Sequence, residues 1–184
     1  VVYAFLADGL EEVECLATAD VLIRAGVKVK LVSITGKKEV KGAHGFGIHA
    51  DTLLHEIDPM KADLLFLPGG MPGTMHLLEN ETVNAVIRKF AEEGKLVAAI
   101  CAAPSVLGAA GLLEGKHATC HPGFEEKLTG ATTSEDEVVV DGNIITSRGM
   151  GTAIPFAFEI VRYFTDDETV EHVRQGLVYR ANEK

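Results

Sequence analysis

Residues 1–34 decide the fold, and they read VVYAFLADGLEEVECLATADVLIRAGVKVKLVSI. The first six residues are continuously apolar and stop before Asp8, which is typical of a strand buried on both faces of a parallel sheet. We expect a helix over residues 11–25, ended by Gly26, and a second strand over residues 27–34. Two strands joined through a helix pair in parallel, so this unit predicts an α/β fold.

The remainder of the chain continues the alternation of strands and helices, and no repeat, linker or change in composition divides it. We therefore predict one domain over residues 1–184, a doubly wound α/β sandwich whose mostly parallel central sheet has helices on both faces. The elements expected after the first unit are short strands near residues 39–40 and 47–48, a core strand at 63–67, a helix at 81–93, the central strand at 96–100, a helix from Pro104 to about Gly111, a hairpin of residues 138–140 and 144–146, and helices at 151–164 and 167–179.

Composition limits the classes of partner. The formal charge of -10 is spread along the chain without a basic patch, so we expect neither nucleic acid nor a membrane surface as a partner. The three cysteines, Cys15, Cys101 and Cys120, are odd in number and form no C-x-x-C pair. This usage favours a reducing compartment and hence a cytoplasmic location.

Cys101 is the residue best placed for nucleophilic chemistry. A lone cysteine in an apolar stretch is more often a packing residue. Cys101, however, lies at the corner between the strand at 96–100 and the helix that begins at Pro104, and the alanines beside it suit a tight turn. Ligands gather at the carboxyl ends of parallel strands, and a helix N-terminus favours a thiolate. We expect a cysteine pKa lowered toward neutrality.

Backbone amides near this corner complete an expected oxyanion site. Gly69 and Gly70 end the preceding core strand and should lie beside Cys101, where their amides and that of Ala102 would receive a negatively charged oxygen. The sequence therefore predicts a nucleophilic thiol with an oxyanion site beside it.

Glu14 is an anomaly on the first expected helix. At about 100° per residue it falls within an apolar stripe of Leu10, Val13, Ala17 and Val21, while Glu11 and Glu12 point elsewhere. A buried carboxyl group has a raised pKa unless it is paired, so Glu14 is either a protonated acid or the partner of another group. The alternative is a glutamate at the edge of the stripe that reaches water.

Two further polar residues are candidates with plain alternatives. His121, in a turn after a short strand, is either an assisting catalytic group or a surface histidine. Arg148, in the stretch from Ser147 to Thr152, either binds an anion or belongs to a rigid turn that caps the next helix. No spacing of histidine with cysteine or carboxylates matches a metal motif, so we predict neither a metal nor another cofactor.

Five motifs together resemble the ThiJ/PfpI superfamily, and within it the branch of Parkinson disease protein 7 and bacterial YajL. They cover essentially the whole chain and read DGLEEVE at residues 8–14, LPGG at 67–70, AICAAP at 99–104, HP at 121–122 and SRG at 147–149. Two positions depart from the pattern, because His44 stands where relatives often carry arginine and Met150 replaces a proline. These departures concern the anion site and the dimer contacts.

The resemblance implies a flavodoxin-like fold, a homodimer, and an oxidation-prone Cys101 hydrogen-bonded to a protonated Glu14. Implied activities are glutathione-independent glyoxalase chemistry on a small reactive carbonyl, deglycation of glycated proteins, and stress or chaperone roles. Our leading hypothesis is cofactor-free conversion of methylglyoxal to lactate by Cys101, Glu14 and His121. The alternatives are a redox sensor or chaperone without turnover, and a cysteine peptidase or amidase, which Ala102 disfavours because that branch has histidine there.

Overall fold

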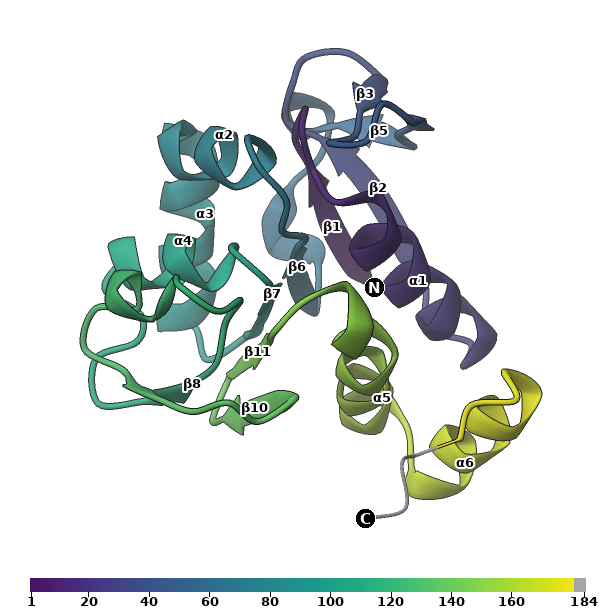
Figure 1. The fold of residues 1–184 in the computed structure, drawn as a ribbon. Helices are drawn as coiled ribbons and strands as arrows, with labels where there is room; N and C mark the ends of the chain where they lie inside the picture. Colours follow the sequence, from purple (N-terminus) through teal and green to yellow (C-terminus); the bar gives the residue numbers. More distant parts are fainter. Residues whose placement is uncertain (181–184) are drawn as a thin grey trace.

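The computed structural model describes residues 1–180 of the protein. A seven-stranded sheet runs through it (Figure 1). Neighbouring strands in this sheet are parallel, except for one antiparallel hairpin of residues 138–141 and 144–147 at its edge. The order across the sheet is β10 (Val138–Asp141), β11 (Ile144–Ser147), β7 (Leu96–Ile100), β6 (Leu64–Leu67), β1 (Val2–Leu6), β2 (Val29–Ser33) and β5 (Thr52–Leu53). The α/β prediction is confirmed, although β6 rather than β7 occupies the centre.

The residues of β1 show why this sheet carries a layer on each face. All five are buried, and alternate side chains point to opposite faces. Leu6 packs into the cluster formed with α1 (Glu12–Arg24), α5 (Ala153–Phe164) and α6 (Asp167–Gly176). Phe5 packs into the cluster on the other face, with α2 (Gly73–Glu79), α3 (Glu81–Glu92) and α4 (Pro104–Ala109). The two helical layers lie on opposite sides of the sheet in Figure 1.

Several short strands and turns lie outside the seven-stranded sheet. The two expected short strands, β3 (Glu39–Lys41) and β4 (Gly47–His49), form a separate antiparallel pair, and β8 (His117–Ala118) pairs with β9 (Thr132–Thr133). Helix α2 is an addition to the predicted elements. Four 3₁₀ turns complete the chain: η1 (Leu54–Glu56), η2 (Pro59–Lys61), η3 (Glu125–Lys127) and η4 (Met150–Thr152).

The buried face of α1 differs from the expected stripe. Val13 has 46% of its surface exposed, whereas Glu14 has 1% and Glu12 has 4%. Glu12 lies off the expected stripe but is still buried, because the loop before β4 folds over its carboxylate: His44 donates its backbone amide to Glu12 Oε1. The helix thus buries two carboxyl groups close to its first turn.

The parallel strands bring four chain segments to one edge of the sheet. β1, β6, β7 and β11 run side by side in the same direction, so their carboxyl ends meet there. The residues that follow these strands include Glu14, Gly69, Cys101 and Arg148. Among residues 1–180, no helix has the length and apolar character needed to cross a bilayer.

Candidate active site

Cys101 occupies the turn between β7 and α4 with an unusual backbone. Its φ is 65°, in the left-handed region that costs a non-glycine residue about 1–2 kcal/mol. Two backbone hydrogen bonds hold it there: the Cys101 amide donates to Ser147 O at 3.0 Å, and the His121 amide donates to Cys101 O at 2.8 Å. The neighbouring loops therefore fix the direction of a half-buried thiol at the edge of the sheet.

Glu14 lies against this thiol, held by contacts from both sides. Its Oε2 accepts the Gly69 amide at 3.0 Å, and the Cys101 side chain lies next to its carboxyl group. Its own amide donates to Glu11 Oε2 at 2.6 Å, which caps the first turn of α1. A carboxyl group and a thiol thus meet in a largely buried contact.

The two acids titrate as a pair. Burial raises the pKa of Glu14 to about 7, opposed in part by its hydrogen bond with Cys101. Burial, the charge of Glu14 and the hydrogen bond to it raise the pKa of Cys101 to about 12. The pair therefore loses its first proton from Glu14 near neutrality, and the remaining proton lies on the Cys101 sulfur.

The expected lowering of the Cys101 pKa is thus corrected. Helix α4 has only six residues, and the partial charge of a helix end is smaller than the full negative charge of a neighbouring carboxylate. A thiolate forms at neutral pH only when its proton moves to Glu14.

Three backbone amides surround the pair, in two different roles. The amides of Gly70 and Ala102 favour the negative form of the Cys101 sulfur and lower its pKa. The amide of Gly69 is already engaged with Glu14, so a substrate oxygen does not find it free. A side chain at Gly69 would lie 2.5 Å from Cys101 Cβ and 2.7 Å from Glu14 Oε2, which is why glycine stands there.

His121 lies beside the pair, but its side chain makes no hydrogen bond to Glu14 or Cys101. Its Nδ1 is 3.0 Å from Pro122 O, so this nitrogen carries the hydrogen and Nε2 is left as the acceptor in the neutral ring. The ring also packs edge-on against Phe124. His121 is exposed, and its Cδ2 lies 3.7 Å from the point where a side chain of Gly149 would begin.

Arg148 is turned to the loop after β8 and not to the thiol. Its Nε donates to Cys120 O at 3.1 Å and its Nη1 to Glu135 O at 3.4 Å, with the carboxylates of Glu125 and Glu135 at 4.0 Å. These contacts match the rigid-turn alternative, since Thr152 Oγ1 also accepts the amides of Arg148 and Gly149.

Sequence reasoning quoted Gly149 in the SRG motif but gave it no role in the site. A Cβ there would lie 3.9 Å from Glu14 Oε1, so Gly149 lies beside the carboxyl group. The stretch from Ser147 to Thr152 was singled out, but nothing in its spacing relates it to Glu14. Ser147 orients Cys101 through its backbone carbonyl, a role that any residue could fill and that the sequence therefore does not reveal.

The comparison with protein families bears on this arrangement directly. The DJ-1/PfpI family model matches residues 1–163, which include the thiol, its carboxyl partner and the three amides. This chain belongs to the DJ-1/PfpI family.

Other members of the DJ-1/PfpI family match over nearly the whole chain. Drosophila melanogaster protein dj-1beta is 40% identical over 96% of this chain and 96% of its own length. Arabidopsis thaliana protein DJ-1 homolog B is 41% identical over 96% of this chain, which spans 41% of that longer protein. The crystal structure of Drosophila melanogaster DJ-1beta superimposes with a TM-score of 0.92 and covers 98% of both chains at 38% identity.

Two further relatives have informative names. The glutathione-independent glyoxalase DJR-1.2 of Caenorhabditis elegans is 37% identical over 91% of this chain and 89% of its own. A structure of oxidized Toxoplasma gondii DJ-1 matches with a TM-score of 0.93 at 31% identity, over 98% of both chains.

Proposed function

We propose that this DJ-1/PfpI protein is a cofactor-independent, cysteine-dependent enzyme that detoxifies reactive carbonyls, converting methylglyoxal to lactate without glutathione. The observation that carries the proposal is the contact of Cys101 with Glu14, in which the sulfur also receives the Gly70 and Ala102 amides. A relative named as a glutathione-independent glyoxalase supports the reaction class.

The first half of the reaction uses the thiol proton of Cys101. Its transfer from sulfur to Glu14 gives a thiolate beside a neutral carboxyl group, the arrangement needed for attack on the aldehyde carbon of methylglyoxal. A carbon–sulfur bond forms, and the former carbonyl oxygen takes the proton back from Glu14. The Gly70 and Ala102 amides stabilise the negative charge that develops on this oxygen.

The second half uses Glu14 as a base. The carboxylate removes the hydrogen of the aldehyde carbon as a proton, and the electron pair passes to the neighbouring carbonyl to give an enediolate. Glu14 returns the proton to the second carbon while the hydroxyl proton of the first carbon passes to the oxygen of the second, which leaves a lactoyl thioester on Cys101. Water, oriented by Nε2 of His121, releases lactate and restores the thiol, so one water is consumed and no electron is gained or lost.

Lactate formation from methylglyoxal without glutathione tests the proposal. Cys101→Ser should abolish turnover, and Glu14→Gln should reduce it by about 10²-fold or more because the acid–base step is lost. His121→Ala should reduce it less. Full activity in Cys101→Ser would rule the mechanism out.

Deglycation of proteins would use the same thiolate against early carbonyl adducts on side chains. Free methylglyoxal released from such adducts would imitate it. We expect repair of a preformed, methylglyoxal-free adduct if deglycation is direct, and no repair if the apparent activity is glyoxalase chemistry.

A redox role is the second candidate, favoured by the same amides. Hydroperoxide oxidation of Cys101 to a sulfinate would place oxygens where the Gly70 and Ala102 amides and a protonated Glu14 can donate to them. Mass spectrometry after mild peroxide treatment should find the added oxygens on Cys101. Oxidation confined to Cys15 or Cys120 would exclude the role.

We also propose that the chain acts as a homodimer in the cytoplasm. The support for the compartment is the three free cysteines. The support for the dimer is an exposed apolar face of α1, formed by Val13, Leu16 and Ile23, which are 46%, 43% and 59% exposed. A symmetric pair of such faces would bury them against each other.

A further inference from the structure

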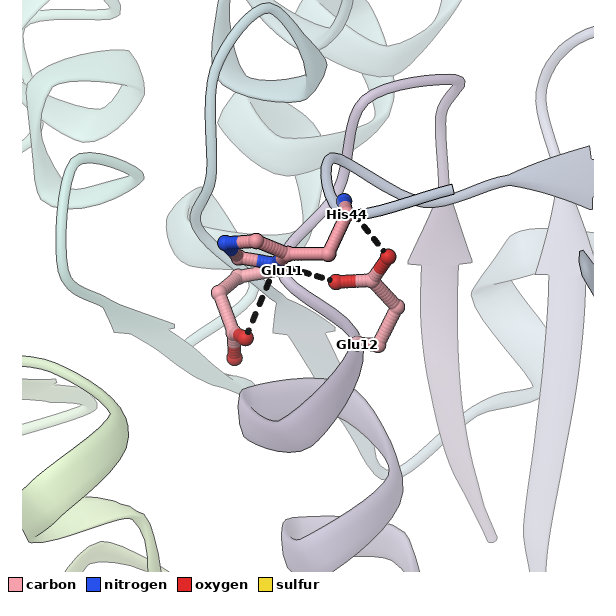
Figure 2. A group of neighbouring side chains, drawn as sticks. All are labelled: Glu11, Glu12 and His44. Atoms are coloured by element: carbon pink, nitrogen blue, oxygen red, sulfur yellow. Dashed lines mark hydrogen bonds and ion pairs between the residues drawn. The ribbon is translucent and has the colours of Figure 1, made fainter. Parts of the chain in front are cut away.

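A second group of charged side chains lies at the start of α1, next to the described pair but separate from it. Figure 2 shows Glu11 and Glu12 on this helix and His44 above them on the loop between β3 and β4. His44 Nδ1 lies 2.8 Å from Glu12 Oε2 and 3.8 Å from Glu11 Oε1. One donor atom from each of the three residues lies within 4.8 Å of the other two.

The loop is built around the Glu12 carboxylate. A Cβ on Gly42 would lie 2.2 Å from Glu12 Oε1, so the carboxylate occupies the space that a larger residue would need. Ala43 donates its amide to Leu10 O at 2.8 Å, which ties the loop to the segment before the helix. The loop is thereby held with His44 facing both carboxylates.

The charges in this group do not balance. Glu12 is buried, and within residues 1–180 His44 is the only cationic group within 4.0 Å of either carboxylate. Glu11 uses Oε2 to cap the helix, which leaves Oε1 available. Even a protonated His44 leaves one net negative charge, whereas a divalent cation with a neutral imidazole leaves none.

We propose that Glu11, Glu12 and His44 bind a divalent cation of the zinc class through Oε1 of Glu11, Oε2 of Glu12 and Nδ1 of His44. One imidazole nitrogen and two carboxylate oxygens suit zinc better than magnesium or calcium, which prefer oxygen ligands alone. His44 is exposed, so the fourth position is open to water and the ion has a path of entry.

The distances require only a small adjustment. Two ligands at about 2.1 Å from a tetrahedral ion are about 3.4 Å apart. The observed 2.8 Å and 3.8 Å between His44 Nδ1 and the two carboxylates lie on either side of that value. Replacement of the proton between His44 and Glu12 by the ion widens the first distance, and a rotation of the Glu11 carboxylate shortens the second.

The sequence predicted no metal site because no ligand motif was visible. His44 lies 32 residues from Glu12, and only the fold of the loop brings them together. The proposal does not depend on the glyoxalase reaction, since none of its ligands takes part in that mechanism.

Zinc titration of the full chain, in competition with a chromophoric chelator, tests the site. The Cys101→Ala variant serves as the parent, because it removes the thiol as an alternative ligand. We expect it to bind one equivalent of zinc, and His44→Arg to lower the affinity at least tenfold. Arginine keeps a cation beside Glu12 but does not ligate metal. His49→Arg is the matched control, since the His49 side chain pairs with Glu39 and the substitution should change affinity less than twofold.

A second measurement locates the ion. In the parent variant, zinc should shift the imidazole nitrogen resonances of His44 and leave those of His49 in place. The proposal is overturned if His44→Arg binds zinc as tightly as the parent, if the parent binds none stoichiometrically, or if the His44 resonances do not move. Circular dichroism of His44→Arg checks that its fold is intact, and Glu11→Gln, which keeps the helix cap, should weaken zinc binding independently.

Discussion

Glu14 shows how one buried carboxyl group links stability to pH. Its pKa of about 7 in the folded protein exceeds the ordinary 4.5, so the folded state binds more protons than the unfolded state between these values. The stabilising difference is complete below about pH 4.5 and is lost as the pH rises through 7, by about 3 kcal/mol in total.

Replacement of this group by an uncharged one of the same shape should remove the effect. Glu14→Gln still accepts the Gly69 amide but has no proton to lose. Above pH 7 we expect the variant to be more stable than the wild type by up to about 3 kcal/mol, with the difference shrinking toward pH 4.5. Urea unfolding at pH 4.5 and pH 8 measures this, and equal pH dependence in both proteins would mean that Glu14 is not buried as a neutral acid.

Gly69 and Gly149 form a matched pair of glycines on either side of Glu14. A Cβ at Gly69 meets atoms at 2.5–2.8 Å, whereas a Cβ at Gly149 meets its neighbours at 3.7–3.9 Å. Gly69→Ala should therefore cost about 1–3 kcal/mol and displace Glu14 or Cys101, with loss of most activity. Gly149→Ala should fold normally. Denaturant unfolding and lactate assays distinguish them, and similar behaviour of the two variants would contradict the described packing.

At the level of single residues, the sequence identified the candidate reactive residues better than it predicted their burial and their pKa values. Cys101 stood out because an apolar strand and a proline bracket it, and Glu14 because it interrupts an apolar stripe. Burial of Glu12 was not predictable, since it depends on a loop from another part of the chain. The raised pKa of Cys101 likewise depends on its burial and on a carboxylate 87 positions away in sequence, neither of which the local pattern contains.

Among the elements, those with strong periodicity were predicted to within a few residues. The strands β1 and β6 and the helices α1 and α3 all follow apolar patterns with clear glycine or turn signals at their ends. Helix α2 was missed because it is only seven residues long and follows LPGGMP, which reads as a turn. Short elements are fixed by tertiary packing, which sequence pattern describes poorly.

The exposed face of α1 supports a prediction about assembly. Leu16 lies within the apolar face that it forms with Val13 and Ile23. Leu16→Lys should convert the proposed homodimer to a monomer in light scattering, because a lysine would be buried without a partner. Val140→Lys is the control, since Val140 is 52% exposed on β10. A wild-type monomer, or a dimer that survives Leu16→Lys, would contradict the proposed interface.

At the scale of the whole protein, the site exists only where distant segments meet. Glu14 comes from α1, Gly69 and Gly70 follow β6, Cys101 follows β7, and Ser147, which fixes the Cys101 amide, ends β11. The parallel sheet is what brings these ends to one edge, so the arrangement requires the complete central sheet. The same sheet leaves the three cysteines in different environments, which makes them reporters of folding.

The three thiols should therefore separate by reactivity. Cys15 and Cys120 are 0% and 1% exposed, whereas Cys101 is half-buried at the edge of the sheet. In native protein, iodoacetamide should label Cys101 alone, and the other two should react only in step with urea unfolding. Peptide mass spectrometry across the urea transition measures all three. If Cys120 is labelled in the native protein as fast as Cys101, the loop held by Arg148 opens locally. Motion of that loop, and not the fixed turn after β7, would then expose Cys101.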